Sequence, residues 1–110
     1  MKTKAIEKKS YKALPKYEDL LIKQLKSKRA AALYLQESLE DYQKEGDAEV
    51  LLLAFRHIAQ AQGGISKLAK KTHLHEKTLY RTLSSKGNPR LDTVWKLFSA
   101  LGFKLKLAAI

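Results

Sequence analysis

The side chains best suited to chemistry lie in one stretch, residues 63–91, with the sequence GGISKLAKKTHLHEKTLYRTLSSKGNPRL. Arginine and lysine can donate to O6 and N7 of guanine, and glutamate can accept from N4 of cytosine. We therefore predict that Lys77 and Arg81 donate to guanine and that Glu76 accepts from cytosine. The full set predicted to contact DNA bases is His75, Glu76, Lys77, Thr78 and Arg81.

A second group of basic residues surrounds this set. Phosphate oxygens of DNA are contacted by lysine and arginine side chains, which position a protein on the duplex without reading sequence. The residues predicted to contact phosphate are Lys67, Lys70, Lys71, Lys86 and Arg90. A surface lysine is often only solvated, and that alternative stays open for each of them.

Two short helices, at about 66–71 and 76–85, must position these side chains. Ala69 supplies the small residue that a close helix crossing needs, and Leu79 and Leu83 are spaced as inner anchors of the second helix. The pattern predicts a helix-turn-helix unit at residues 65–85, whose second helix would enter the major groove of DNA. His73 occupies the turn, where a positive φ often selects glycine. The alternative is a helical corner with no role in DNA binding.

The rest of the chain is predicted to be mostly helical. Residues 1–16 are basic and aperiodic and predict a flexible arm, whereas residues 17–110 predict a single helical domain. Ser27, Asp47 and Asp92 are the expected N-caps of three of its helices. Leu20, Leu21, Leu25 and Tyr34 could belong to the core or form a groove for a partner helix; this alternative also stays open.

The final segment, FKLKLAAI, alternates apolar and basic residues with the period of a β-strand. A lone strand is not stable, so we expect it to pair with its copy in a homodimer. The residues predicted to form this dimer strand are Phe103, Leu105 and Leu107.

The net charge of +11 is distributed unevenly along the chain. Residues 1–29 carry 10 Lys/Arg and 3 Asp/Glu, residues 30–62 carry 2 and 6, and residues 63–110 carry 10 and 2, which gives +7, −4 and +8. Two basic segments therefore flank an acidic one, and this asymmetry favours a polyanionic partner such as nucleic acid. A soluble protein that is merely rich in lysine is the alternative.

Several other classes of function are not expected. The chain has no cysteine, which excludes disulfides and thiolate metal sites. Its start lacks the apolar run of a signal peptide, and no apolar run is long enough to cross a bilayer, so we expect a cytoplasmic protein without membrane contact. The histidines are His57, His73 and His75; they lack the companions of a metal or catalytic site, and His57 is expected at the edge of the core. We expect no enzyme activity, no metal and no cofactor.

From Tyr34 to Leu105 the chain resembles the HigA-like addiction-module antidote proteins. The segments that carry this resemblance are YLQESLED, GDAEVLLLAFRHIAQAQGGISKLAKKTHL and LYRTLSSKGNPRLDTVWKLFSALGFKL. Two residues depart from the family pattern: His73 stands where the family usually has glycine, and His75 where it usually has an N-cap serine. With this resemblance, the predicted fold is a mostly α, five- to six-helix, lambda-repressor-like helix-turn-helix domain with a short C-terminal β-strand.

The resemblance implies an antidote encoded beside a RelE/HigB-like toxin, which is an RNase. It also implies a dimer that binds double-stranded DNA at the operator of its own operon and represses it. The acidic segment ESLEDYQKEGDAE is a candidate contact surface for such a basic toxin. Two alternatives remain: a stand-alone repressor without a toxin partner, and a toxin-binding module with little specific DNA binding.

Overall fold

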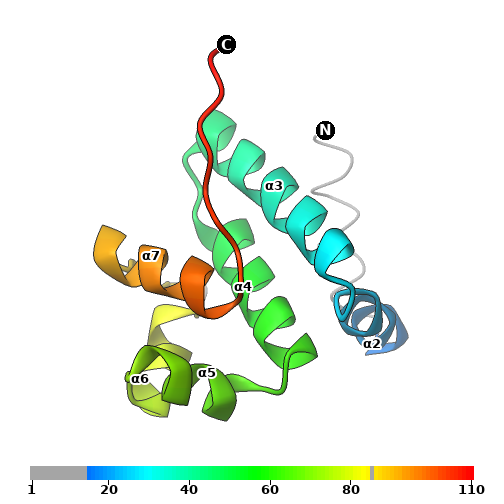
Figure 1. Cartoon of the computed structure of the whole chain (residues 1–110), viewed down its shortest axis with the longest axis vertical. Coiled ribbons are helices and arrows are strands. Elements are labelled where there is room, and N and C mark those ends of the chain that lie inside the picture. The colour runs from blue at the N-terminus through cyan, green and yellow to red at the C-terminus, as the bar shows by residue number, and fades with distance from the viewer. Residues whose placement is uncertain (1–14, 85) are drawn as a thin grey trace.

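The computed structural model describes residues 15–84 and 86–110, and six helices occupy these ranges (Figure 1). They are α2 (Pro15–Gln24), α3 (Lys28–Glu45), α4 (Glu49–Ala61), α5 (Ile65–Thr72), α6 (Glu76–Thr82) and α7 (Leu91–Ala100). The prediction of a mostly α fold is confirmed. None of these helices is long and apolar enough to cross a membrane.

The two ends of α3 and the start of α4 depend on local interactions of residues that the sequence analysis identifies. Ser27 accepts a hydrogen bond from the amide of Ala30 at 3.3 Å and caps the start of α3. Gly46 ends α3 with a φ of 74°, a conformation in which a side chain would be strained. Asp47 accepts a hydrogen bond from the amide of Glu49 at 2.9 Å, but Ala48 occupies the N-cap position of α4, so the predicted cap at Asp47 is wrong by one residue.

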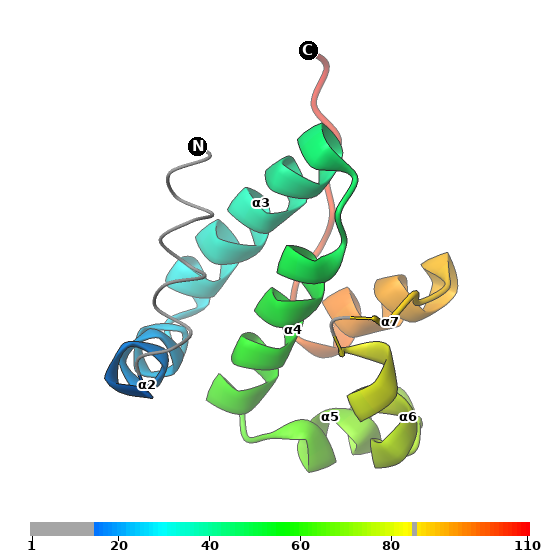
Figure 2. The same ribbon diagram turned by 180° about the vertical axis from the view of Figure 1, so that it is seen from behind.

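Helix α4 is the centre of the core, as its wide apolar stripe predicts. It runs through the middle of the molecule, with α2 and α3 on one side and α7 on the other (Figures 1 and 2). Leu52, Phe55 and Ile58 are almost completely buried. The rings of Phe55 and Phe98 meet edge to face with their centroids 4.9 Å apart, which joins α4 to α7. The core of α4 therefore supports the helices on both sides.

Three further predicted boundaries need correction. Asp92 is not an N-cap: α7 begins at Leu91, Arg90 occupies the cap position, and Asp92 lies in the first turn, where its charge favours the helix dipole. The helix predicted to reach residue 85 ends at Thr82. Helix α2 starts at Pro15, a residue suited to the first helical position. Residues 1–14 of the predicted arm lie outside the described residues.

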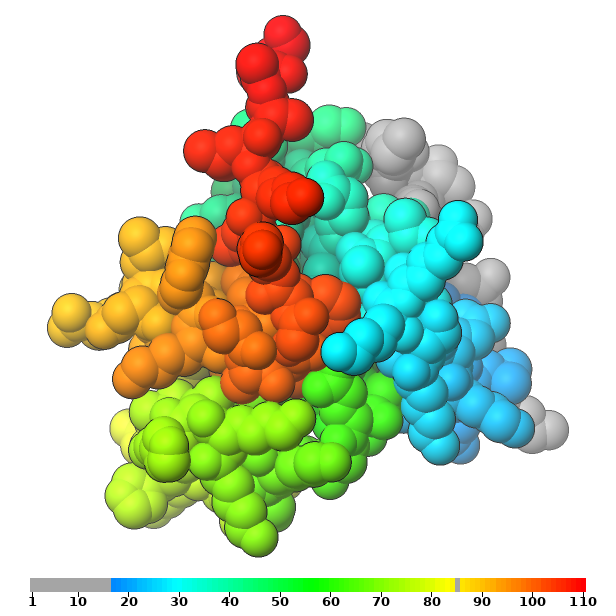
Figure 3. Space-filling model, viewed as in Figure 1, coloured from blue at the N-terminus to red at the C-terminus, as the bar shows by residue number. Residues whose placement is uncertain are grey.

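The predicted C-terminal β-strand is wrong for the single chain. Residues 103–110 form no strand, and the described part of the chain offers no neighbouring strand with which they could form a ladder. The alternation of the segment is nevertheless real. Phe103 and Leu105 are half-buried against the core, whereas Leu107 is fully exposed. The period-two pattern therefore arises from an extended tail laid on the helical body, seen crossing it in Figure 3.

Candidate nucleic-acid interface

Helices α5 and α6 form the corner that the sequence predicts. Leu79 and Leu83, the expected inner anchors of α6, are both completely buried. Leu68 and Ala69 of α5 are buried as well, and Leu74 after the turn packs against the core. One side of α6 is therefore fixed in the core, so its other side faces outward in a defined orientation.

The turn between these helices depends on an uncommon backbone conformation. His73 has a φ of 59° and a ψ of 29°, and it is the one non-glycine residue with a positive φ in the described ranges. Its amide donates to the carbonyl of Ala69 and so ends α5. The left-handed turn that normally selects glycine is thus made by a histidine, at a cost in strain.

A His73→Gly variant is expected to be more stable than the wild type, by about 1 kcal/mol, because glycine adopts this conformation without a clash of its Cβ. The measurement is the free energy of unfolding in urea. His75→Gly is a matched control, since His75 has a φ of −69° and glycine relieves no backbone strain there. A loss of stability in His73→Gly would show that the imidazole makes a stabilising contact.

The start of α6 is held by a contact with α5 rather than by a cap. His75 occupies the N-cap position with an extended backbone, and its side chain makes no capping hydrogen bond. Glu76 instead accepts a hydrogen bond from the hydroxyl of Ser66 at 2.9 Å. The carboxylate predicted to accept from cytosine is therefore engaged within the protein, although it remains exposed.

The outward face of α6 differs in part from the predicted set. Lys77 and Arg81, one helical turn apart, are both exposed, and Thr78 is half-buried. Tyr80 was missed by sequence reasoning, yet it is 60% exposed between them. Its position three residues after Lys77 could have revealed it, because that spacing places two residues on one side of a helix. The outer face of α6 thus presents two cations and an aromatic ring.

The residues predicted to contact phosphate fall on two sides of α5. Lys70 lies one turn after Ser66, on the side that meets α6. Lys67 and Lys71 instead line a small crevice on the side toward α4 and α7. Lys86 is exposed beyond α6. The structure therefore brings Lys70 next to the outer face of α6 and places Lys67 and Lys71 away from it.

Gly87, which follows α6, packs closely against the backbone at the end of that helix. A Cβ added to Gly87 would lie 1.9 Å from the carbonyl oxygen of Thr82, so no other residue fits without movement of the backbone. The amide of Gly87 donates to the carbonyl of Ser84 at 2.9 Å. Arg90, at the end of the loop between α6 and α7, pairs with Asp92 at 3.4 Å on the open surface. Arg90, the last of the residues predicted to contact phosphate, therefore lies at the start of α7.

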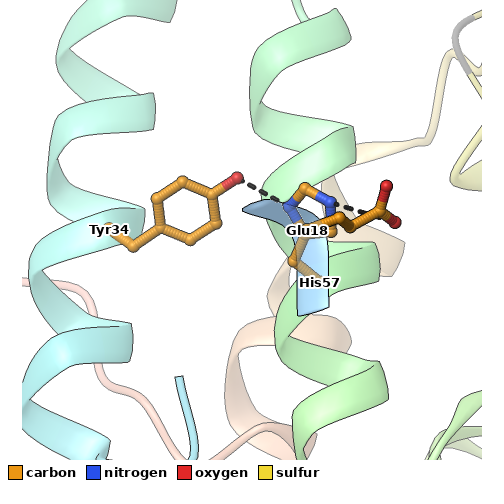
Figure 4. A network of polar contacts seen from close by, with 3 residues as sticks. All are labelled: Glu18, Tyr34 and His57. Atoms are coloured by element: carbon orange, nitrogen blue, oxygen red, sulfur yellow. Dashed lines mark hydrogen bonds and ion pairs between the residues drawn. The ribbon is translucent and has the colours of Figure 1, made fainter. Parts of the chain in front are cut away.

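A buried polar cluster lies on the far side of α4 and joins three helices (Figure 4). The hydroxyl of Tyr34 in α3 lies 2.8 Å from Nδ1 of His57 in α4. Nε2 of His57 lies 3.7 Å from Oε1 of Glu18 in α2. His57 is only 5% exposed, so the expectation that it lies at the edge of the core is wrong. In the described ranges no three His, Asp or Glu residues form a group that could hold a metal ion.

A Tyr34→Phe variant is expected to lose about 1–3 kcal/mol of stability, because Nδ1 of buried His57 loses its partner. Burial raises the pKa of the Tyr34 hydroxyl, and the negative charges of Tyr17 and Glu18 act in the same direction. The neutral phenol is thus favoured in the folded state. Its contribution is complete below the unfolded pKa of about 10 and is lost as pH rises toward the higher folded pKa.

Urea unfolding at neutral pH and near pH 11 checks this prediction. The wild type should lose more stability between the two pH values than Tyr34→Phe does, because only the wild type carries the buried phenol. Tyr42→Phe is the matched control, since Tyr42 is exposed. Equal losses in wild type and Tyr34→Phe would contradict the assignment.

Comparison with known proteins identifies the family to which the chain belongs. Residues 11–109 match the family described as "Probable addiction module antidote protein". A protein of Haemophilus influenzae, described as "Uncharacterized protein", is 34% identical over 83 residues, which are 76% of this chain and 80% of that protein. No solved structure matches. An antidote implies a toxin partner of some kind. The chain belongs to the family of probable addiction module antidote proteins.

Proposed function

We propose that the protein is the DNA-binding antitoxin of a type II toxin–antitoxin module. It neutralises a RelE/HigB-like RNase toxin and, as a homodimer, represses its own operon by binding the operator. The observation that carries the DNA-binding part is the outer face of α6. Leu79 and Leu83 anchor this helix in the core, and Lys77 and Arg81 point to solvent from its other side.

The chemistry of this face supports base recognition in the major groove. Lys77 and Arg81 supply donors for the O6 and N7 acceptors of guanine. Lys70, Lys86 and Arg90 are exposed and can neutralise phosphates around the same site. A dimer would place two copies of α6 in successive major grooves, about one helical turn or roughly 34 Å apart. A palindromic operator with that spacing is the expected target.

The toxin part of the proposal rests on the family and on charge. The family is one of antidotes. The RelE/HigB-like type of toxin is what the resemblance of residues 34–105 to the HigA-like antidotes implies. Glu40, Glu45 and Asp47 are exposed at the junction of α3 and α4, on a segment whose net charge opposes that of the rest of the chain. Such a surface would attract a basic protein.

Co-expression with the product of the adjacent gene tests the toxin part. The expected result is that the neighbouring protein alone stops growth, that this chain restores it, and that the two purify together. Growth arrest without rescue would contradict the antitoxin assignment. A neighbouring gene that encodes no toxin would favour a stand-alone repressor.

One observation favours a second candidate, a toxin-binding module with little specific DNA binding. His75 makes no capping hydrogen bond, and His73 strains the turn before it, so the start of α6 is less firmly held than in a capped helix. This candidate predicts rescue from the toxin together with DNA binding that is equal for operator and random duplex. The proposed function predicts a clear preference for the operator.

A further inference from the structure

The outer face of α7 exposes the single tryptophan of the chain. Asp92, Trp95, Lys96 and Ser99 are all exposed and follow the i, i+3, i+4, i+7 spacing of one helix face. Trp95 is 55% exposed and Leu91, one turn earlier, is 76% exposed. Tryptophan is enriched where proteins bind one another, because it buries a large area and loses little side-chain freedom. Neither the core nor the outer face of α6 uses these residues.

This face borders a groove with a volume of about 830 Å³ between the end of α5 and α7. A second hollow of about 400 Å³ continues from it along the tail, and the two share Trp95 and Ser99. The side chains that line the first groove are mostly from α7; the others are Lys71 and Thr72 at the end of α5 and His73 in the turn that follows it. The groove and the exposed indole thus form one continuous surface on one side of the molecule.

Asp92 and Lys96 are placed to pair with their counterparts in a second copy of the same face, where the partner's Lys96 would join Arg90 of the same chain, 3.4 Å away, beside Asp92. Along α7, Asp92 precedes Trp95 by three residues and Lys96 follows it by one, so opposite charges lie one helical turn apart. When two such helices pack antiparallel about a two-fold axis beside Trp95, each Asp92 comes alongside the partner's Lys96. The same axis brings the two indoles together. The same helix face, present once in each copy, then forms an apolar contact and two ion pairs with its counterpart.

The C-terminal tail, residues 103–110, is less suited than α7 to form the homodimer contact. Any antiparallel pairing of residues 103–107 with their copy places lysine opposite lysine, because Lys104 and Lys106 occupy the same face of the segment. Phe103 and Leu105 are, in addition, already packed against the core of their own chain. Lysines on an open edge oppose strand pairing in general.

We propose that the outer face of α7 is the homodimer interface, with Trp95 at its centre and reciprocal ion pairs between Asp92 and the partner's Lys96. This proposal says which surface forms the homodimer. It rests on the homodimer of the proposed function, but not on DNA binding or toxin binding. One face of a ten-residue helix is smaller than the roughly 800 Å² per partner of a standard interface. The dimer therefore dissociates on dilution.

The interface is tested by sedimentation velocity on the full chain, without DNA or toxin, and by variants in which the charge of Asp92 or Lys96 is reversed. The wild type should form dimers as concentration rises, and the emission of Trp95 should shift to shorter wavelength in parallel. Asp92→Lys alone and Lys96→Asp alone each place like charges across the axis. Each should weaken the dimer about 100-fold or more. An equimolar mixture of these two variants should restore the dimer, because every pair across the axis is again opposite in charge.

Each other outcome counts against the interface. Dimers that persist in both single variants would place the contact elsewhere while leaving a homodimer in the proposed function. A wild type that stays monomeric would overturn both the interface and the proposed homodimer, and leave the antitoxin role to the rescue experiment. A monomer whose Trp95 emission shifts only when toxin is added would assign this face to the toxin. All variants carry surface substitutions, and circular dichroism verifies that they fold.

Discussion

A Lys77→Ala, Arg81→Ala double variant loses the preference for operator over random duplex, with operator affinity falling by about 1000-fold or more. Each side chain is exposed on the outer face of α6 and can donate to guanine. Each good base contact contributes about 1–3 kcal/mol of discrimination, so two of them account for most of a specific preference. Neither residue is buried, so the fold should survive both substitutions.

Lys70→Ala is the matched control for this variant. Lys70 lies on the side of α5 that meets α6 and is predicted to contact phosphate, which carries no sequence information. Its loss should weaken operator and random duplex equally. It should also reduce the slope of log affinity against log salt by about 0.9 for each contact removed. Operator preference that survives in the double variant would show that α6 is not the reading helix.

Leu79→Ala is expected to lower the free energy of unfolding by about 2–5 kcal/mol, because it leaves a cavity beneath α6. Leu79 is completely buried and is the anchor that orients the outer face. A domain of this size has about 5–15 kcal/mol of stability in total, so this one substitution removes a large part of it. DNA binding should fall with the folded fraction.

Leu91→Ala makes the same chemical change at a residue that is 76% exposed, and it should cost less than about 0.5 kcal/mol in the monomer. The measurement is urea unfolding of Leu79→Ala and Leu91→Ala at a low protein concentration. It shows whether the loss of stability comes from the burial of the leucine or from the change of residue type alone. Similar losses in both would contradict the packing described for α6.

The positions of the helices could largely be predicted from the sequence, because they depend on local chemistry. Ser27 and Gly46 act at single, recognisable positions at the two ends of α3, whereas the start of α4 lies one residue later than the predicted cap at Asp47 implies. His73 adopts the positive φ expected of the turn residue. The central place of α4 follows from its wide apolar stripe.

The features that were missed depend on contacts between distant residues. The pairing of Tyr34 with His57 joins residues 23 positions apart, and no local pattern announces it. The tail alternates like a strand, but only the fold shows that Phe103 and Leu105 pack on the core of their own chain. The separation of Lys70 from Lys67 and Lys71 likewise required knowing which side of α5 meets α6. Exposure of Trp95 could not be predicted, because tryptophan is highly buried on average in folded proteins.

The central claim is that this antidote-family protein reads its own operator through α6. Titration of the purified chain against the DNA upstream of its own gene, and against a scrambled duplex of equal length, tests it most directly. We predict at least about a thousand-fold preference for the upstream DNA at physiological salt, together with steep weakening as salt increases. Equal affinity for the two duplexes, with the same salt dependence, would contradict the claim and leave only non-specific attraction between a basic protein and DNA.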